Sequence, residues 1–120
     1  VLKEIIKDKE FPDRDAIFAA FGHFTAQLHE QGMLHADYSM GNVLFEPNEK
    51  GVDFQLVDLN RMRFGKKINC HKGCQNFERI DTDAHALSVI ARAYAQARGF
   101  DEEECVRLVL KMRWRKHKKN

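Results

Sequence analysis

The chain has 120 residues, of which 43% are hydrophobic and 32% are charged, a composition that predicts one globular domain with a substantial core. No segment approaches the roughly 18 consecutive apolar residues of a membrane-spanning helix, and no secretory signal opens the chain, so neither a membrane-embedded nor an exported protein is expected. The formal net charge is +2, but six of the 20 basic residues lie in the last ten positions, where no acidic residue occurs, so the positive charge belongs to the C-terminal tail.

The first third of the chain predicts two helices. A short amphipathic helix over Val1–Lys9 is followed by a longer one at about Arg14–Gln31, in which apolar residues recur at spacings of three and four. Asp13 or Asp15 is the expected N-cap of the longer helix, and Gly32 stands where a C-terminal glycine belongs.

A β-hairpin is predicted after a loop at 33–42 that has neither helical nor strand periodicity. Two short apolar runs follow at 43–45 and 54–57. The turn-rich segment 46–51 between them is typical of a hairpin connection.

The last third predicts two more helices after a polar, irregular stretch at 59–78. Aspartates at 81 and 83 are expected N-caps of an alanine-rich helix that ends at Gly99, and Asp101 is the expected cap of a final helix that runs into the basic tail. The predicted single domain thus has a long helix at 13–31, a loop at 33–42, a hairpin at 43–58, C-terminal helices at 81–113 and a basic tail at 114–120.

The loop and the hairpin carry the residues with the clearest chemistry. The loop contains His35-x-Asp37-x-x-x-x-Asn42, and Asp58 closes the second apolar run. In phosphoryl transfer a carboxylate orients the attacking hydroxyl, while an amide oxygen and a second carboxylate hold the Mg²⁺ ions that neutralise nucleotide phosphates. Asp37 fits the first task, and Asn42 and Asp58 fit the second because the hairpin is expected to bring them alongside each other. His35 is expected to brace the loop by hydrogen bonding, and Gly41 to supply an unusual backbone angle.

This arrangement resembles the protein-kinase-like superfamily, whose catalytic loop has the form His-x-Asp-x-x-x-x-Asn and whose metal-binding aspartate follows one hairpin later. The resemblance covers about residues 13–63. Within the superfamily the chain is similar to the lipopolysaccharide core kinases, the bacterial Kdo and heptose kinases, through Leu28-His29, the His-x-Asp loop and Val57-Asp58-Leu59-Asn60-Arg61. The resemblance implies a mainly α-helical α+β fold, a protein-kinase-like C-terminal lobe with one short β-hairpin after the catalytic loop.

The resemblance also implies an activity, an ATP- and Mg²⁺-dependent phosphotransferase whose acceptor is a sugar hydroxyl of a lipopolysaccharide core or similar saccharide. It implies that Asp37 is the catalytic base and that His35 also belongs to the catalytic residues. It implies that Asn42 and Asp58 bind the metal ion and, through it, the nucleotide. Ser39 occupies the position where serine/threonine protein kinases usually carry lysine. RIO-type kinases also tend to have serine there, so a RIO-like or other atypical kinase remains an open alternative.

Arg61, Arg63 and Ser39 are the candidate substrate contacts. The two arginines suit phosphate or carboxylate groups on an acidic glycan, and they suit a purely loop-bracing role equally well. Asp81 or Asp83 is expected either to anchor the catalytic-loop backbone, as an aspartate does in the family, or to serve only as an N-cap.

The parts of a kinase that grip ATP are missing from the sequence pattern. Nothing before Asp13 supplies a glycine-rich loop, a strand lysine or a helix glutamate, so the chain is expected to be an incomplete C-terminal lobe, without its N-lobe and inactive alone. The alternative is a non-catalytic kinase-like binding module. A cytoplasmic location is expected, with peripheral contact between the basic tail and an anionic inner membrane as an open option and with no nucleic-acid partner.

Cys70, Cys74 and Cys105 are expected to be reduced thiols, since their number is odd and no secretory context is present. Two of them lie close to His71, but structural zinc is not expected, because Cys105 and the remaining histidines form no recognisable second ligand pair. Metal or redox sensing through Cys70 and Cys74 stays as the weaker alternative.

Overall fold

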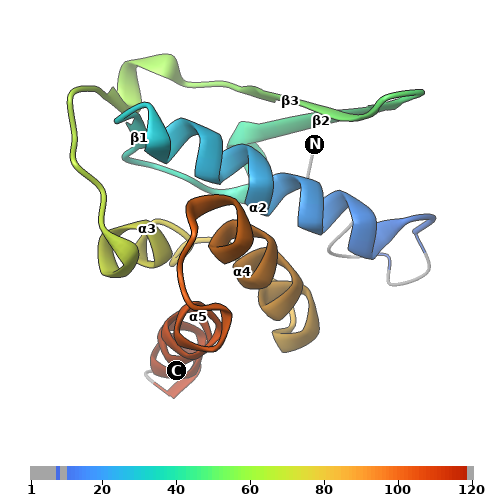
Figure 1. Ribbon diagram of the computed structural model, residues 1–120. Coiled ribbons are helices and arrows are strands. Elements are labelled where there is room, and N and C mark those ends of the chain that lie inside the picture. Colours follow the sequence, from blue (N-terminus) through green and yellow to red (C-terminus); the bar gives the residue numbers. More distant parts are fainter. Residues whose placement is uncertain (1–7, 9–10, 119–120) are drawn as a thin grey trace.

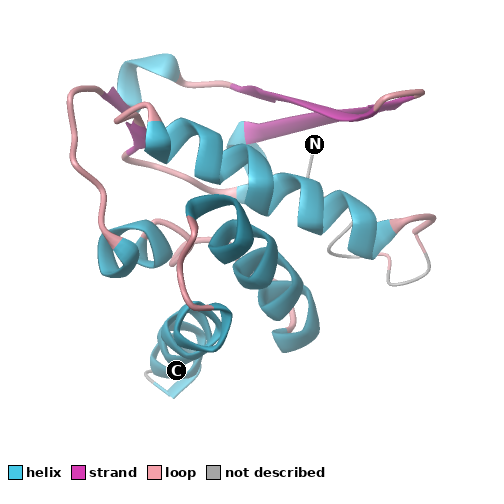
Figure 2. Cartoon of the chain, viewed as in Figure 1, coloured by secondary structure: helices cyan, strands magenta, loops and turns pink. Residues whose placement is uncertain are grey.

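The computed structural model describes residue 8 and residues 11–118, so nearly all of the helix predicted over Val1–Lys9 lies outside the described residues. The fold is α+β and mainly helical, with two small antiparallel sheets (Figure 2). Three long helices form the body: α2 (Arg14–Glu30), α4 (Ala84–Arg98) and α5 (Glu102–Lys118). None of the described helices is both long and apolar enough to cross a lipid bilayer.

Helix α2 is the central element, with the β2–β3 hairpin on one side of it and α4 and α5 on the other (Figure 1). It begins after Asp13, which has a left-handed φ of 57° and makes no side-chain capping bond. Its buried face includes Ile17, Phe18 and Phe21, all 2% exposed or less. Gly22 lies on the same face, where an added Cβ would meet the α4 backbone carbonyl of Ile90. The glycine therefore permits the close approach of α2 to α4.

The C-terminal helices begin and end at the predicted signals. The Asp83 carboxylate accepts a hydrogen bond of 2.8 Å from the Ala86 N–H and caps α4, while Gly99 ends it with a left-handed φ of 74°. Helix α5 starts after Asp101 and continues through Lys118, so the stretch predicted as a basic tail is largely helical in the described residues.

The hairpin is longer than predicted. Strands β2 (Val43–Asn48) and β3 (Gly51–Leu56) pair from Val43↔Leu56 to Asn48↔Gly51, so most of the expected connection is strand and only two residues form the turn. Pro47 can stand inside β2 because a two-stranded sheet has free edges, where a missing N–H costs no ladder bond.

A second small sheet and three short helices were not predicted, and the second sheet corrects the expectation of a single hairpin. Strands β1 (Leu34–His35) and β4 (Met62–Arg63) form a second antiparallel sheet, with Leu34 opposite Arg63 and His35 opposite Met62. A short helix, α3 (Cys70–Gln75), lies in the stretch expected to be irregular. One-turn 3₁₀ helices at Met40–Asn42 and Leu59–Arg61 complete the fold.

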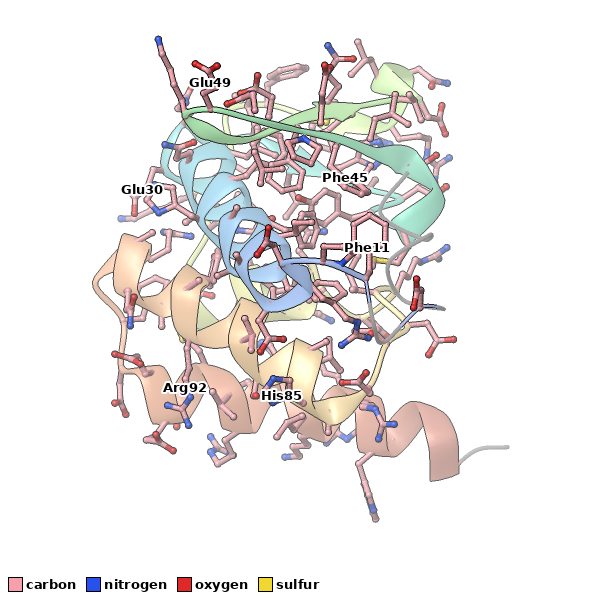
Figure 3. The ribbon with its side chains drawn as sticks, turned by 90° about the vertical axis from the view of Figure 1, so that its right-hand side faces the viewer. Phe11, Glu30, Phe45, Glu49, His85 and Arg92 are labelled. Atoms are coloured by element: carbon pink, nitrogen blue, oxygen red, sulfur yellow. The ribbon has the colours of Figure 1, made fainter. Side chains whose placement is uncertain are left out.

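Aromatic side chains join the hairpin to the helical body. Phe54 of β3 contacts Phe21 and Phe24 of α2, with ring centroids 5.8 and 5.2 Å apart. Phe45 of β2 meets Phe11, just before α2, edge to face at 6.0 Å (Figure 3). The hairpin is thereby fixed against α2, which places the ends of its strands beside the loop that precedes it.

Candidate functional site

The loop at 33–42 is attached at both ends to the chain around Asp58. At its start, the Ala36 N–H donates to the Arg61 carbonyl at 2.8 Å, next to the β1–β4 pair. At its end, the Val57 N–H donates to the Asn42 carbonyl at 3.0 Å. Asp58 follows directly after that bond, so the structure brings it alongside Asn42 as the sequence predicted.

Asp37 and Asn42 are joined within the loop. The Asn42 Nδ2 group donates to the Asp37 backbone carbonyl at 2.9 Å and lies 3.5 Å from Oδ2 of the same residue. This leaves Asn42 Oδ1 without a hydrogen-bond partner among the described residues. Asp37 and Asn42 are thus in contact within the loop, and a backbone hydrogen bond joins Asn42 to the residue that precedes Asp58.

Asp58 is held in a strained backbone conformation. Its φ and ψ are 60° and 52°, in the left-handed region that residues with a side chain rarely adopt. Its side chain caps nothing, is exposed, and has no ion-pair or hydrogen-bond partner within the described part of the chain. Gly41, where the unusual angle was expected, has no left-handed φ and lies in a 3₁₀ turn, so that expectation was wrong.

His35 braces the loop. Its ring is 1% exposed, Nδ1 accepts the Asp37 N–H at 3.0 Å, and Nε2 donates to the Val57 carbonyl at 3.0 Å. Because a backbone N–H only donates and a carbonyl only accepts, these partners fix the neutral tautomer with the proton on Nε2. His35 therefore ties Asp37 to Val57, the residue before Asp58, and is positioned to orient the loop rather than to touch a substrate.

A buried polar chain supports the loop from beneath. Asn76 donates to the His35 carbonyl at 3.0 Å and accepts from His29 Nε2 at 2.9 Å, while His29 Nδ1 accepts from the Tyr94 hydroxyl at 2.7 Å. Arg98 completes the chain by donating to the Tyr94 oxygen at 2.7 Å. Burial lowers the pKa of His29 from 6.5 to about 4, so the ring is neutral at pH 7, as these bonds require.

Arg79 is the charged partner of Asp37, at 3.1 Å between its guanidinium and Oδ1. The Arg79 side chain is 69% exposed and that of Asp37 is 33% exposed, so solvent and ligands reach both. Neither Arg79 nor Asn76 was identified from the sequence. Each lies some forty residues from its loop partner, and only the path of the chain after α3 brings them there.

The remaining predicted residues make no side-chain hydrogen bond or ion pair with Asp37 or Asn42 within the described residues. Ser39 precedes the 3₁₀ turn and makes no side-chain cap. Arg63 donates only to nearby backbone carbonyls, and the exposed Arg61 guanidinium has no partner in the described residues. Asp83 caps α4 and pairs with Arg14 at 2.8 Å. The side chain that holds the loop backbone is that of Asn76, through the His35 carbonyl, and not that of Asp83.

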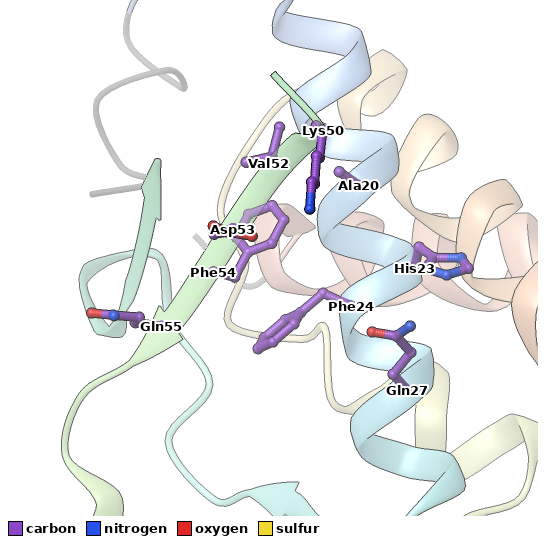
Figure 4. Close-up of a pocket in the computed structure, with 10 residues that line it drawn as sticks. Ala20, His23, Phe24, Gln27, Lys50, Val52, Asp53, Phe54 and Gln55 are labelled. Carbon is purple, nitrogen blue, oxygen red and sulfur yellow. The ribbon is translucent and has the colours of Figure 1, made fainter. Parts of the chain in front are cut away.

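A groove of about 770 Å³ lies elsewhere, between α2 and β3 (Figure 4). It is lined by residues such as Phe24, Lys50 and Phe54, and by none of the predicted site residues. The candidate site is therefore defined by the polar loop and its braces and not by this groove.

Comparison with known proteins supports the resemblance read from the motifs. A family model described as "Lipopolysaccharide kinase (Kdo/WaaP) family" matches residues 4–109, which is most of the chain. No curated protein and no solved structure matches the chain. The match includes the His-x-Asp-x-x-x-x-Asn motif, both sheets, α3 and α4, and it favours the lipopolysaccharide kinase branch over the RIO-like alternative.

Proposed function

The chain belongs to the lipopolysaccharide kinase (Kdo/WaaP) family, a family of kinases, and we propose that it takes part in phosphoryl transfer from ATP to a sugar hydroxyl of a lipopolysaccharide core or similar saccharide. One observation carries the proposal. The loop that carries Asp37 and Asn42 is hydrogen-bonded to the residues around Asp58, through Asn42 to Val57 and through Ala36 to Arg61, and His35 links Asp37 to Val57.

Asp37, Asn42 and Asp58 each have the chemistry for one task. Asp37 accepts a hydrogen bond from the attacking hydroxyl and takes up its proton. Asn42 Oδ1 and the Asp58 carboxylate are hard oxygen donors of the kind that Mg²⁺ prefers, and both lack a protein partner in the described residues. The strained backbone of Asp58 fits a carboxylate that is oriented for a ligand. Bound Mg²⁺ supplies positive charge against the nucleotide phosphates.

In this proposal Arg79 supplies a positive charge beside Asp37, which Ser39, at the position where serine/threonine protein kinases usually carry lysine, cannot supply. The Arg79 guanidinium lies 3.1 Å from the Asp37 carboxylate. Because Arg79 is largely exposed, it is free to exchange its contact with Asp37 for the oxygens of the transferred phosphoryl group. In this proposal Arg79 orients the Asp37 carboxylate before the substrates bind and neutralises phosphate charge during transfer.

The groups that grip ATP are proposed to come from an N-terminal lobe upstream of the chain. The described residues before the loop contain no glycine-rich hairpin and no strand lysine. Leu59 and Phe64, just beyond Asp58, are 66% and 68% exposed, the apolar surface expected where a second lobe covers the site. In this proposal the 120-residue chain alone does not turn over ATP.

The experiment compares the chain with a protein extended upstream of Val1, using ATP, Mg²⁺ and a lipopolysaccharide core acceptor. The extended protein should transfer phosphate to the acceptor, and Asp37→Asn and Asp58→Asn should each lower kcat by at least about 100-fold. Asp53→Asn is the matched control, because Asp53 is an exposed hairpin carboxylate whose partner is Asn48. Normal turnover by the Asp37 or Asp58 variant would remove that residue from the mechanism.

The end of α5 is proposed to touch an anionic membrane surface, which would place the protein at the cytoplasmic face of the inner membrane. Trp114 is 59% exposed and lies on α5 close in sequence to the exposed Lys111 and Arg115. An aromatic ring flanked by basic residues suits an interface with acidic lipid headgroups. Trp114 fluorescence should change with anionic vesicles and not with neutral ones, and an equal response to both would exclude this contact.

A further inference from the structure

The fold brings all three cysteines together at a place remote from the catalytic loop. Cys70 and Cys74 are four residues apart on α3 and therefore share one face of that helix, and Cys105 faces them from the first turns of α5. Their three sulfur atoms lie within 4.8 Å of one another, with Cys70 and Cys105 3.6 Å apart. Cys105 and the histidines were expected to form no second ligand pair, but helix α3, which the sequence did not predict, places Cys70 and Cys74 beside Cys105.

The spacing of the sulfurs is that of metal ligands. A zinc–sulfur bond is about 2.3 Å, so thiolates around one ion in trigonal or tetrahedral geometry lie about 3.8 to 4.0 Å apart. The Cys70–Cys105 separation of 3.6 Å and the upper limit of 4.8 Å for all three sulfur pairs lie on either side of this value. Sulfur atoms in a disulfide are about 2.0 Å apart, so the cluster is closer to coordination geometry than to a bond between any two thiols.

We propose that Cys70, Cys74 and Cys105 form a binding site for a soft, thiophilic metal ion of the Zn²⁺ and Cu(I) class. Cys74 and Cys105 are fully buried, whereas Cys70 is half-buried, so the ion enters from the Cys70 side and can take a further ligand there. Such an ion binds cysteine as thiolate, so binding releases protons from the thiols.

A metal ion at this position would link α5 to the segment that supports the catalytic loop. Asn76 follows α3 directly and holds the His35 carbonyl, and Arg79, three residues later, contacts Asp37. Binding would therefore stabilise the segment that carries both contacts. The site itself does not depend on the proposed kinase function, because its ligands are separate from Asp37, Asn42 and Asp58.

The test is a titration of the reduced, chelator-treated 120-residue chain with Cd²⁺, whose thiolate complexes absorb in the ultraviolet, and then with Zn²⁺ in competition. We expect a charge-transfer band that saturates at one equivalent, partial loss of that band when Zn²⁺ is added in large excess, and a rise of about 5 °C or more in the thermal midpoint with excess metal. Cys70→Ser and Cys105→Ala should lose the band and the rise.

Val109→Ala is the matched control, because Val109 is a buried residue of the same helix without a sulfur. It should keep the full one-equivalent band even though its thermal midpoint falls. Circular dichroism establishes that each cysteine variant is folded, and Cys70→Ser at a half-buried position is the less disruptive of the two. Binding that survives the cysteine substitutions, or reduced wild-type protein that gives no band, would overturn the proposal.

Discussion

Acidification should destabilise the protein through His29. Burial, reinforced by nearby Arg98 and opposed by the hydrogen bond to Asn76, lowers the pKa of His29 from 6.5 to about 4. A proton added to Nδ1 would remove the site that accepts the Tyr94 hydroxyl. Because the folded pKa lies below the unfolded value, the unfolded chain binds more protons between these two values. The stability that depends on neutral His29 is thus present above pH 6.5 and is lost as the pH falls toward 4.

The magnitude follows from the two pKa values. Lowering the pH from 7 to 5 should remove about 2 kcal/mol of unfolding free energy through this one group. His29→Gln keeps a donor and an acceptor but does not titrate, so its loss over the same interval should be smaller by that amount. Urea denaturation of both proteins at the two pH values measures the difference, in which the shared titration of the carboxylates cancels.

His23→Gln is the matched control, since His23 is an exposed histidine on the same helix. It should lose as much stability as the wild type between pH 7 and pH 5. Equal losses in the wild type and in His29→Gln would refute the reasoning, and so would an NMR titration of His29 with a midpoint near that of a free histidine.

Three further substitutions test the contacts around the loop. Arg79→Gln should lower kcat of the extended protein about tenfold or more, with KM and urea stability nearly unchanged, because the exposed pair with Asp37 contributes little to folding. Partial recovery by Arg79→Lys would support the charge argument, and a change in KM alone would contradict it. Asn76→Ala should cost about 2 kcal/mol in urea denaturation by leaving the His35 carbonyl without its donor, and unchanged stability would show that water replaces the amide. Gly22→Ala should cost about 2 kcal/mol because its methyl group meets the α4 backbone, and an unchanged thermal midpoint would show that the two helices can separate without cost.

The helices and the motif were predictable because their signals are local. Asp83 caps α4 through a bond to a backbone N–H three residues away, and Gly99 ends it with the left-handed angle that glycine adopts most easily. The backbone contact between Asn42 and the residue before Asp58 follows from the same kind of signal, since one hairpin joins the two segments. The catalytic and metal-binding roles of Asp37, Asn42 and Asp58 stay a prediction.

The parts that were missed depend on contacts between distant segments. Helix α3 is one turn and a half long and contains Gly73, a poor helix former, which is needed there because a side chain would collide with the Tyr94 ring. Arg79 and Asn76 reach the loop only after α3 has turned the chain back. The left-handed residue falls on Asp58 and not on Gly41, against residue preference, so tertiary bonds on both sides of Asp58 decide its conformation.

The series of buried hydrogen bonds that runs from Arg98 to His35 also determines the order in which parts of the fold can form. Its bonds join residues 65 positions apart at His29 and Tyr94 and 41 apart at His35 and Asn76, so the loop cannot acquire its geometry until α4 has been synthesised and has docked on α2. Secondary structure in α2 and the hairpin can form earlier, but the arrangement of the candidate site is among the last features to be completed. Loop amides should accordingly exchange their hydrogens at the rate set by opening of the α2–α4 contact, as one cooperative unit with the core.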